Sequence, residues 1–192
     1  MLEPLARFIE QVGLESGRLG IPSIDREDGL VLYTAGLLTS SRLPGLAAAD
    51  LGAGIGYSTA WIAAGLEYGC RGTCRLYAVE ADCGLAERGR RLFAEAPLER
   101  VRVEWICGDA AEFLEGLPAS GLGLAFVDVA KREYPRILKL LGEKLAVGGV
   151  ALFHNAYFPR PPERFYEMMG RPPWRGGVAP TPAGLAVLVR EG

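Results

Sequence analysis

The sequence predicts an α/β protein whose sheet is covered by helices on both faces, and three observations support this. From about residue 43 onward, short apolar runs alternate with segments of helical period, which is typical of parallel βαβ units. A glycine-rich turn follows the first run, and polar residues follow most of the others. We therefore expect a Rossmann-like, doubly wound, mostly parallel seven-stranded sheet with an antiparallel C-terminal hairpin.

Each element follows from its local pattern. Apolar residues at helical spacing predict a helix over residues 2–12, and a second helix over 25–40 begins at Asp25, a typical N-cap residue. Strands are expected at 46–51, 75–80, 101–107, 122–128 and 149–154. The helices between and after them are expected at 57–68, 82–95, 109–116, 132–146 and 163–169. A hairpin of residues 174–180 and 185–190 closes the chain.

Length and composition narrow the class of protein. The 192 residues predict a single domain, with N-terminal helices in 1–42 and a cofactor-binding core in 43–192. The net charge of −2 argues against a nucleic-acid partner, although a local basic patch would still permit one. No run approaches the roughly 20 apolar residues of a membrane span, and residues 1–12 do not form a signal peptide. We expect a cytoplasmic protein without a membrane partner.

The cysteines do not indicate a metal site, because their spacing lacks the paired pattern of zinc ligands. They are Cys70, Cys74, Cys83 and Cys107. Reduced thiols are expected in a cytoplasmic protein. A bridge between Cys70 and Cys74 is the alternative if the source organism is a hyperthermophile.

The turn after the first apolar run is the strongest motif. Residues 47–59 read AAADLGAGIGYST, with Asp50 before three alternating glycines and Tyr57 after them. These glycines are Gly52, Gly54 and Gly56. A strand that enters a helix through such a turn brings backbone N–H groups close to a ligand. The spacing is not the Gly-x-Gly-x-x-Gly of NAD-binding proteins, because Tyr57 stands at the third glycine position.

This turn instead resembles the first motif of class I S-adenosylmethionine (SAM)-dependent methyltransferases. Glu80 ends the second predicted strand, 30 residues after Asp50, at the position where an acidic group holds a ribose diol in such folds. The resemblance implies further cofactor contacts from the first helical turn, from the end of the third strand and from the end of the fourth. Their residues are Tyr57, Ser58, Asp109, Ala110 and Asp128. Asp109 is also a typical N-cap, and Tyr57 and Ser58 are also consistent with a packed helical turn.

Residues 126–134 and 148–155 narrow the resemblance to O-methyltransferases of the catechol and caffeoyl-coenzyme A type. In that family an aspartate at the position of Asp128, with an Asp-Asn pair after the fifth strand, binds a divalent cation. A lysine at the position of Lys131 deprotonates the substrate hydroxyl. The resemblance therefore implies catalytic roles for Asp128 and Lys131, and a Mg²⁺ or Mn²⁺ site at Asp128, His154 and Asn155.

His154 departs from the family pattern, which has aspartate there. A neutral imidazole in place of a carboxylate weakens Mg²⁺ binding and favours softer cations. Two alternatives to a metal stay open. His154 is a candidate general base in its own right, or the acceptor site has decayed and only cofactor binding remains.

The sequence thus favours SAM-dependent methyl transfer to a hydroxyl oxygen of a small phenolic or catechol-like acceptor. The alternatives are a hydroxylated tRNA base as acceptor and a cofactor-binding protein with impaired catalysis; a NAD-dependent oxidoreductase fits the glycine spacing least. Three aromatic residues near prolines are candidate walls for a flat acceptor, namely Tyr157, Phe158 and Trp174. The family resemblance also implies a homodimer.

Overall fold

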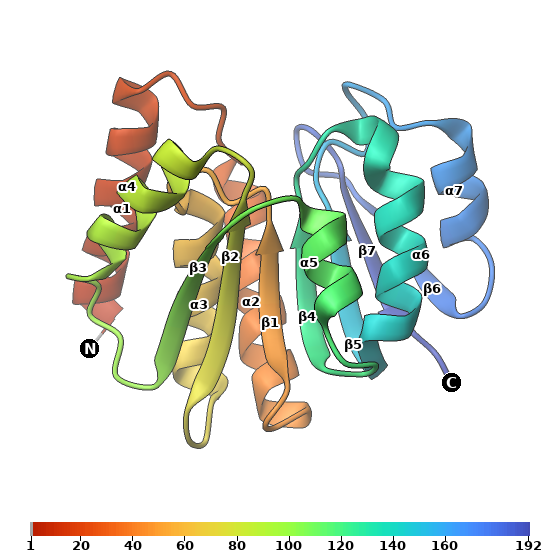
Figure 1. The fold of residues 1–192 in the computed structure, drawn as a ribbon, viewed down its shortest axis with the longest axis horizontal. Coiled ribbons are helices and arrows are strands. Elements are labelled where there is room, and N and C mark those ends of the chain that lie inside the picture. The colour runs from red at the N-terminus through yellow and green to blue at the C-terminus, as the bar shows by residue number, and fades with distance from the viewer. Residues whose placement is uncertain (1) are drawn as a thin grey trace.

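The computed structural model describes residues 2–192 and has a twisted sheet between two layers of helices (Figure 1). Over these residues the strands are β1 (Ala47–Leu51), β2 (Cys74–Glu80), β3 (Val101–Cys107), β4 (Leu122–Val127), β5 (Leu145–Phe153), β6 (Trp174–Ala179) and β7 (Leu185–Arg190). Their order across the sheet is β3-β2-β1-β4-β5-β7-β6. The first five in this order pair in parallel, and β7 is antiparallel to both β5 and β6. The predicted fold class is confirmed.

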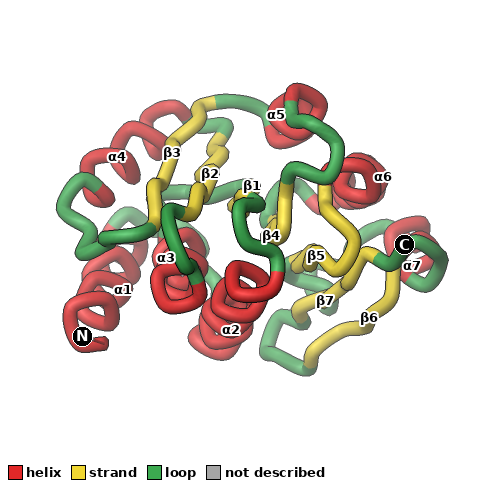
Figure 2. The backbone as a smooth tube through the Cα atoms, turned by 90° about the horizontal axis from the view of Figure 1, so that it is seen from below, coloured by secondary structure: helices red, strands yellow, loops and turns green. Residues whose placement is uncertain are grey.

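Helices cover both faces of the sheet (Figure 2). They are α1 (Leu2–Arg18), α2 (Arg26–Arg42), α3 (Tyr57–Gly69), α4 (Cys83–Phe93), α5 (Ala110–Gly116), α6 (Tyr134–Lys144) and α7 (Glu163–Met169). Helices α2 and α3 pack on one face, with α1 and α4 beside them, and α5 to α7 pack on the other. No helix in the described part of the chain is long and apolar enough to cross a membrane.

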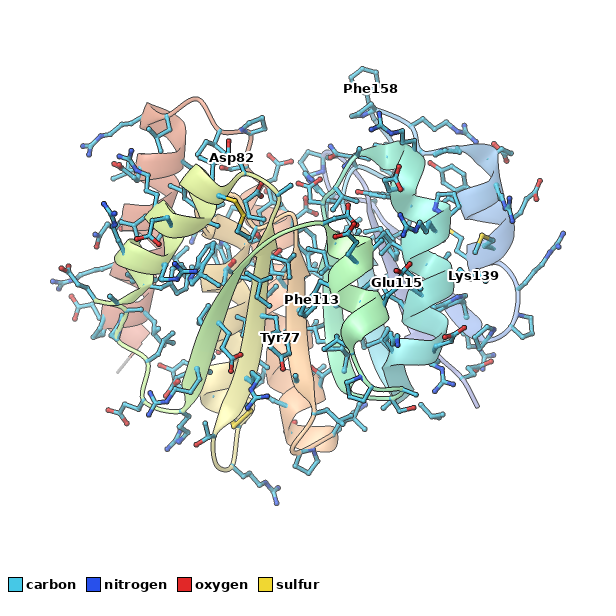
Figure 3. All side chains as sticks on the ribbon, viewed as in Figure 1. Tyr77, Asp82, Phe113, Glu115, Lys139 and Phe158 are labelled. Carbon is cyan, nitrogen blue, oxygen red and sulfur yellow. A yellow bond between two sulfur atoms is a disulfide. The ribbon has the colours of Figure 1, made fainter. Side chains whose placement is uncertain are left out.

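The period-2 geometry of the strands divides the core between the two faces. On β2, Leu76 joins the cluster under α2 and α3, whereas Val79, three residues further along, joins the cluster under α5 and α6. Tyr77 also faces α5, where its ring packs edge-on against Phe113 with centroids 5.1 Å apart (Figure 3). All six residues of β4 are buried, as expected for a central parallel strand covered on both faces.

Two boundaries differ clearly from the prediction. Helix α1 continues to Arg18 instead of ending at residue 12, because its later turns keep packing beside α3 and α4. Strand β5 starts at Leu145 rather than residue 149, since Leu145 pairs with Leu122 before the register shifts. The helix expected over 132–146 accordingly ends at Lys144. The N-cap predicted at Asp25 has the right backbone geometry but no side-chain hydrogen bond.

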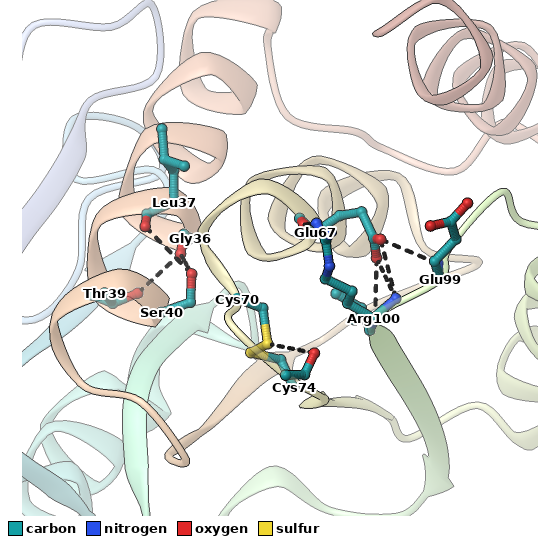
Figure 4. The surroundings of a disulfide bond; sticks show 11 residues. Gly36, Leu37, Thr39, Ser40, Glu67, Cys70, Cys74, Glu99 and Arg100 are labelled. Carbon is teal, nitrogen blue, oxygen red and sulfur yellow. Dashed lines mark hydrogen bonds between the residues drawn. A yellow bond between two sulfur atoms is a disulfide. The ribbon is translucent and has the colours of Figure 1, made fainter. Parts of the chain in front are cut away.

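The expectation of reduced cysteines is wrong. Cys70 and Cys74 are bridged, with Cα atoms 6.1 Å apart, and so are Cys83 and Cys107, 5.0 Å apart. The first bridge closes the turn between α3 and β2 (Figure 4). Near it, the buried carboxylate of Glu67 accepts hydrogen bonds from the backbone N–H groups of residues 99–101 and anchors the start of β3. The second bridge joins the segments that follow β2 and end β3.

Candidate active site

The carboxyl ends of the parallel strands meet at a pocket of about 480 Å³. Among its walls are five of the residues that the sequence singled out, namely Gly52, Glu80, Asp109, Ala110 and Asp128. A crevice at this end of a doubly wound sheet is where such folds bind ligands. The polar residues at the ends of these strands therefore share one pocket.

The three glycines of the turn have positive φ angles, but for different reasons. A methyl group on Gly52, at φ 95°, would overlap the carbonyl oxygen of Asp128, and one on Gly56 would overlap the ring of Phe93. A methyl group on Gly54, at φ 57°, would meet only a side-chain methyl of Ile21 at 3.5 Å. Gly52 and Gly56 are thus required by packing, whereas a methyl group at position 54 would make only an ordinary van der Waals contact.

Glu80 holds the glycine turn from the end of β2. Its Oε2 accepts a hydrogen bond from the backbone N–H of Gly54 at 2.8 Å, and its Oε1 accepts one from Asp82 at 2.9 Å. Asp82 in turn caps α4 by accepting from the N–H groups of Gly84 and Leu85. Glu80 therefore orders the turn and presents its carboxylate to the pocket at the same time.

Asp50 and Ser58 form a buried unit beneath the turn. Oδ2 of Asp50 accepts hydrogen bonds from Ser58 at 2.7 Å and from Thr59 at 2.5 Å, while its Oδ1 has no protein partner. Burial raises the pKa of Asp50 to about 7, although the Thr59 and Ser58 hydroxyls oppose the shift. Tyr57 packs against Gly13 and Trp61. Thr59, in the first turn of α3, is a partner that sequence reasoning missed.

Asp109 caps helix α5 beside the pocket. Its Oδ1 accepts hydrogen bonds from the N–H groups of Ala111 at 2.9 Å and Glu112 at 3.0 Å. The N-cap interpretation is therefore confirmed, and the exposed side chain still faces the pocket together with Ala110.

A row of four charged groups runs inward from the pocket. Nζ of Lys131 lies 2.7 Å from Oδ1 of Asp128, and Oδ2 of Asp128 lies 3.0 Å from Nδ1 of His154. Nε2 of His154 lies 3.2 Å from Oδ2 of Asp28 on α2. Side-chain exposure is 16% for Lys131 and 27% for Asp128, but 8% for His154 and 0% for Asp28. Sequence reasoning missed Asp28.

The two carboxylates decide the charge of His154. Burial by itself would lower the pKa of this imidazole, but contacts with Asp128 and Asp28 outweigh burial and raise the pKa to about 9. Burial likewise acts to raise the pKa of Asp128, yet His154 and Lys131 hold it below its usual value. At neutral pH His154 is a cation, which disfavours the alternative that it acts as the general base.

Tyr134 positions Lys131 and was also missed by sequence reasoning. Its buried hydroxyl accepts a hydrogen bond from Nζ of Lys131 at 2.8 Å and donates to the carbonyl oxygen of His154 at 2.8 Å. Burial raises the pKa of the Tyr134 phenol, so the hydroxyl stays protonated. A Lys-x-x-Tyr spacing at the start of a helix is the only signal in the sequence, and it is a weak one.

Comparison with known families decides the class of the protein. Residues 49–156, more than half of the chain, match the family model of a methyltransferase domain. The chain belongs to this methyltransferase family. No curated protein matches the sequence significantly. The methyltransferase interpretation of the glycine turn is therefore confirmed, and the oxidoreductase alternative is excluded.

Solved structures share the fold of this methyltransferase over nearly its whole length. A Corynebacterium glutamicum protein aligns with a TM-score of 0.80 at 18% identity, covering 99% of this chain and 90% of that one. An O-methyltransferase from Bacillus cereus in complex with SAH aligns at 0.78 and 21%, covering 96% and 91%. The O-methyltransferase TomG from Streptomyces achromogenes, in complex with SAM, aligns at 0.75 and 21%, covering 99% and 90%.

The divalent cation implied by the resemblance does not fit the donors of this methyltransferase. Both oxygens of Asp128 are engaged, by Lys131 and by His154. The amide nitrogen of Asn155 donates to the carbonyl oxygen of Phe158 at 2.9 Å. Over residues 2–192 no group of three or more His, Cys, Asp and Glu side chains is arranged to hold a metal ion. The metal site predicted at Asp128, His154 and Asn155 therefore has no support from the described donors.

The shifted pKa of His154 predicts a pH-dependent stability. Because the pKa rises from 6.5 to about 9 on folding, its stabilising effect is complete below pH 6.5 and is lost as the pH rises to 9. At 1.36 kcal/mol per pKa unit, the loss is on the order of 3 kcal/mol. Urea unfolding at pH 6.5 and pH 9 measures it. A His154→Gln variant should lose much less stability over this interval, and an equal loss in both proteins would contradict the assignment.

Proposed function

We propose that this methyltransferase transfers a methyl group from SAM to a hydroxyl oxygen of a small phenolic or catechol-like acceptor. The observation that carries the proposal is the position of Lys131. It lies at the end of β4 beside Asp128, which itself lines the pocket of Gly52, Glu80 and Asp109. The amine of Lys131, which can act as a base, thus lies next to the cofactor pocket. Methyl transfer to a hydroxyl requires such a base, because the hydroxyl must lose its proton.

The pocket fits SAM by shape and by chemistry. Gly52, at the start of the turn, lines the pocket, so the backbone of the turn can lie close to a ligand. The carboxylate of Glu80 is a suitable acceptor for ribose hydroxyls, and Asp109 is suited to an amine at the edge of an adenine ring. When bound, SAM supplies a methyl group on a sulfonium sulfur. The names of the SAM-bound and SAH-bound structures of the same fold support this choice.

Lys131 and its neighbours prepare the acceptor oxygen. In its neutral form, Lys131 accepts the proton of the acceptor hydroxyl, and the resulting ammonium stabilises the anionic oxygen. Asp128 and Tyr134 hold Nζ of Lys131 from two sides, which restricts where that proton can go. Positioning of this kind supplies much of the reduction of the barrier in a bimolecular reaction.

The acceptor side of the site favours a flat aromatic molecule. Tyr157 and Phe158, which follow β5, are 49% and 80% exposed, and Figure 3 shows Phe158 at the same end of the molecule as Asp82. Exposed aromatic side chains at this end of the molecule can stack on a ligand ring. The third aromatic candidate, Trp174, is instead buried in the core between β6 and α6, so its predicted role is wrong.

Cofactor binding is tested by calorimetry with SAM and with NAD. We expect binding of SAM alone, and Glu80→Gln should weaken it about 10-fold or more, because one hydrogen bond to a charged group contributes about 1.5–3 kcal/mol. The matched control is Glu104→Gln, an exposed acid on β3 that forms a surface ion pair with Arg75. Preference for NAD, or equal affinities in both variants, would contradict the cofactor assignment.

The remaining features of the proposal concern the whole chain. We propose that residues 1–192 act as one cytoplasmic methyltransferase domain, with helices in 1–42 flanking a cofactor-binding core in 43–192. The two disulfides agree with a hyperthermophilic source, where such bonds occur inside cells.

A homodimer is also proposed, and the apolar groove of about 730 Å³ between α2, β5 and β7 is its candidate interface. Sedimentation over a range of concentrations measures the oligomeric state.

A further inference from the structure

We infer that Asp28 is a positioning residue for methyl transfer, and that the ion pair of Asp28 and His154 takes the place of a divalent cation. The inference rests on the proposed function and deepens it. If the ion pair replaces the cation, the reaction does not depend on a divalent metal. The positive charges around Asp128 are then the Lys131 ammonium and the protonated His154 ring.

The burial of Asp28 is the first observation. Its side chain is fully buried in the first turn of α2, where its Oδ1 contacts no hydrogen-bond donor. A buried carboxylate costs several kcal/mol unless a counter-charge compensates it. The cation that the structure provides is His154, with Nε2 at 3.2 Å from Oδ2, in an ion pair rather than an aligned hydrogen bond.

The second observation is that His154 lies between two carboxylates. Its Nδ1 is hydrogen-bonded to Asp128, and its Nε2 lies within ion-pair distance of Asp28, so a ring protonated on both nitrogens has a carboxylate on each side. The resemblance places a carboxylate at position 154. In this chain the carboxylate comes from α2, and a cationic ring fills the space between it and Asp128.

The charges of the row explain why a metal is not needed. When Lys131 holds its proton, two cations, Lys131 and His154, alternate with two anions, Asp128 and Asp28, and the row is neutral. Mg²⁺ and Mn²⁺ bind where carboxylate oxygens are free to coordinate. Here His154 orients Oδ2 of Asp128, which leaves Oδ1 directed at Lys131. Asp28 thereby acts on the acceptor site through His154.

The test compares four proteins after EDTA treatment: the wild type, Asp28→Asn, the Glu27→Gln control and the double variant Asp28→Asn with His154→Asp. Glu27 is the exposed acid next to Asp28 in the same helical turn. Mn²⁺ binding is measured by electron paramagnetic resonance and SAM binding by calorimetry. Methyl transfer to catechol is measured with EDTA, Mg²⁺ or Mn²⁺. His154 is the sole histidine of the chain, so its ring nitrogens give a single set of NMR signals.

We expect the wild type to bind no Mn²⁺, to keep its activity in EDTA and to show an imidazolium with two protonated nitrogens at neutral pH. Asp28→Asn should lower kcat about 10- to 100-fold, the usual effect of losing a group that orients a functional side chain, and should shift the ring signals without changing SAM affinity. Glu27→Gln should change neither kcat nor the NMR signals of the His154 ring. The double variant should gain Mn²⁺ binding.

Two results would overturn the inference: tight Mn²⁺ binding with EDTA-sensitive activity in the wild type, or unchanged ring signals in Asp28→Asn. Failure of the proposed function itself looks different, because then SAM would not bind or catechol would not be methylated with any metal. The Mn²⁺ and NMR measurements would still report on Asp28 and His154 in that case.

Discussion

Replacing Lys131 by methionine is expected to lower kcat by about 100- to 10,000-fold, the usual contribution of a positioned acid or base. Methionine keeps the length of the side chain but can neither accept a proton nor carry a charge. Because Lys131 is not among the residues that line the cofactor pocket, the affinity for SAM should stay unchanged. Rates with catechol and calorimetry with SAM measure the two effects separately.

Two further variants sharpen this prediction. Lys131→Arg keeps a positive charge near Asp128, but a guanidinium does not release its proton near neutral pH, so activity should remain low if proton transfer is the role. Lys139→Met is the matched control, because Lys139 is exposed on α6, away from the site (Figure 3). Full activity of Lys131→Met would remove Lys131 from the mechanism.

Replacing Gly52 by alanine is expected to destabilise the protein by about 2–6 kcal/mol, the sum of backbone strain and overpacking. Its φ of 95° is rarely adopted by other residues, and the new methyl group would overlap the backbone of Asp128 at the end of β4. Backbone cannot move aside as a flexible side chain can. Either the turn or the end of β4 must therefore shift, and SAM binding should be lost as well.

The variant Gly54→Ala distinguishes the backbone strain of a positive φ angle from the steric overlap that the new methyl group causes at position 52. At φ 57° alanine costs only about 1–2 kcal/mol, and its methyl group would make an ordinary contact with Ile21. Chemical denaturation of both variants measures the difference. Equal stability losses in Gly52→Ala and Gly54→Ala would show that contact with Asp128 is not what requires a glycine at position 52.

The elements near the pocket of Gly52, Glu80 and Asp109 were predictable because their signals are local. Asp50, the alternating glycines and the start of α3 lie within about ten consecutive residues, and turn geometry depends on such short segments. Glu80, Asp109 and Asp128 were predictable for a second reason. Parallel strands bring their carboxyl ends to one edge, so a residue at the end of a strand is placed by the fold class alone.

The acceptor side was less predictable because its partners are distant in sequence. Asp28 precedes its partner His154 by more than a hundred residues, and nothing in its local pattern distinguishes it from the exposed Glu27. The bridge of Cys83 and Cys107 was missed for the same reason, since four cysteines allow several pairings. It depends on β2 and β3 being neighbours in the sheet.

The sequence by itself determined the α/β class, the antiparallel C-terminal hairpin, the glycine turn and the acidic residues at the strand ends. Periodicity and turn chemistry encode these features locally. Only the tertiary structure decided the charge of His154. A histidine is neutral or cationic according to its neighbours, and here those neighbours are a carboxylate from β4 and another from α2. Their approach to one ring depends on the packing of α2 over the sheet.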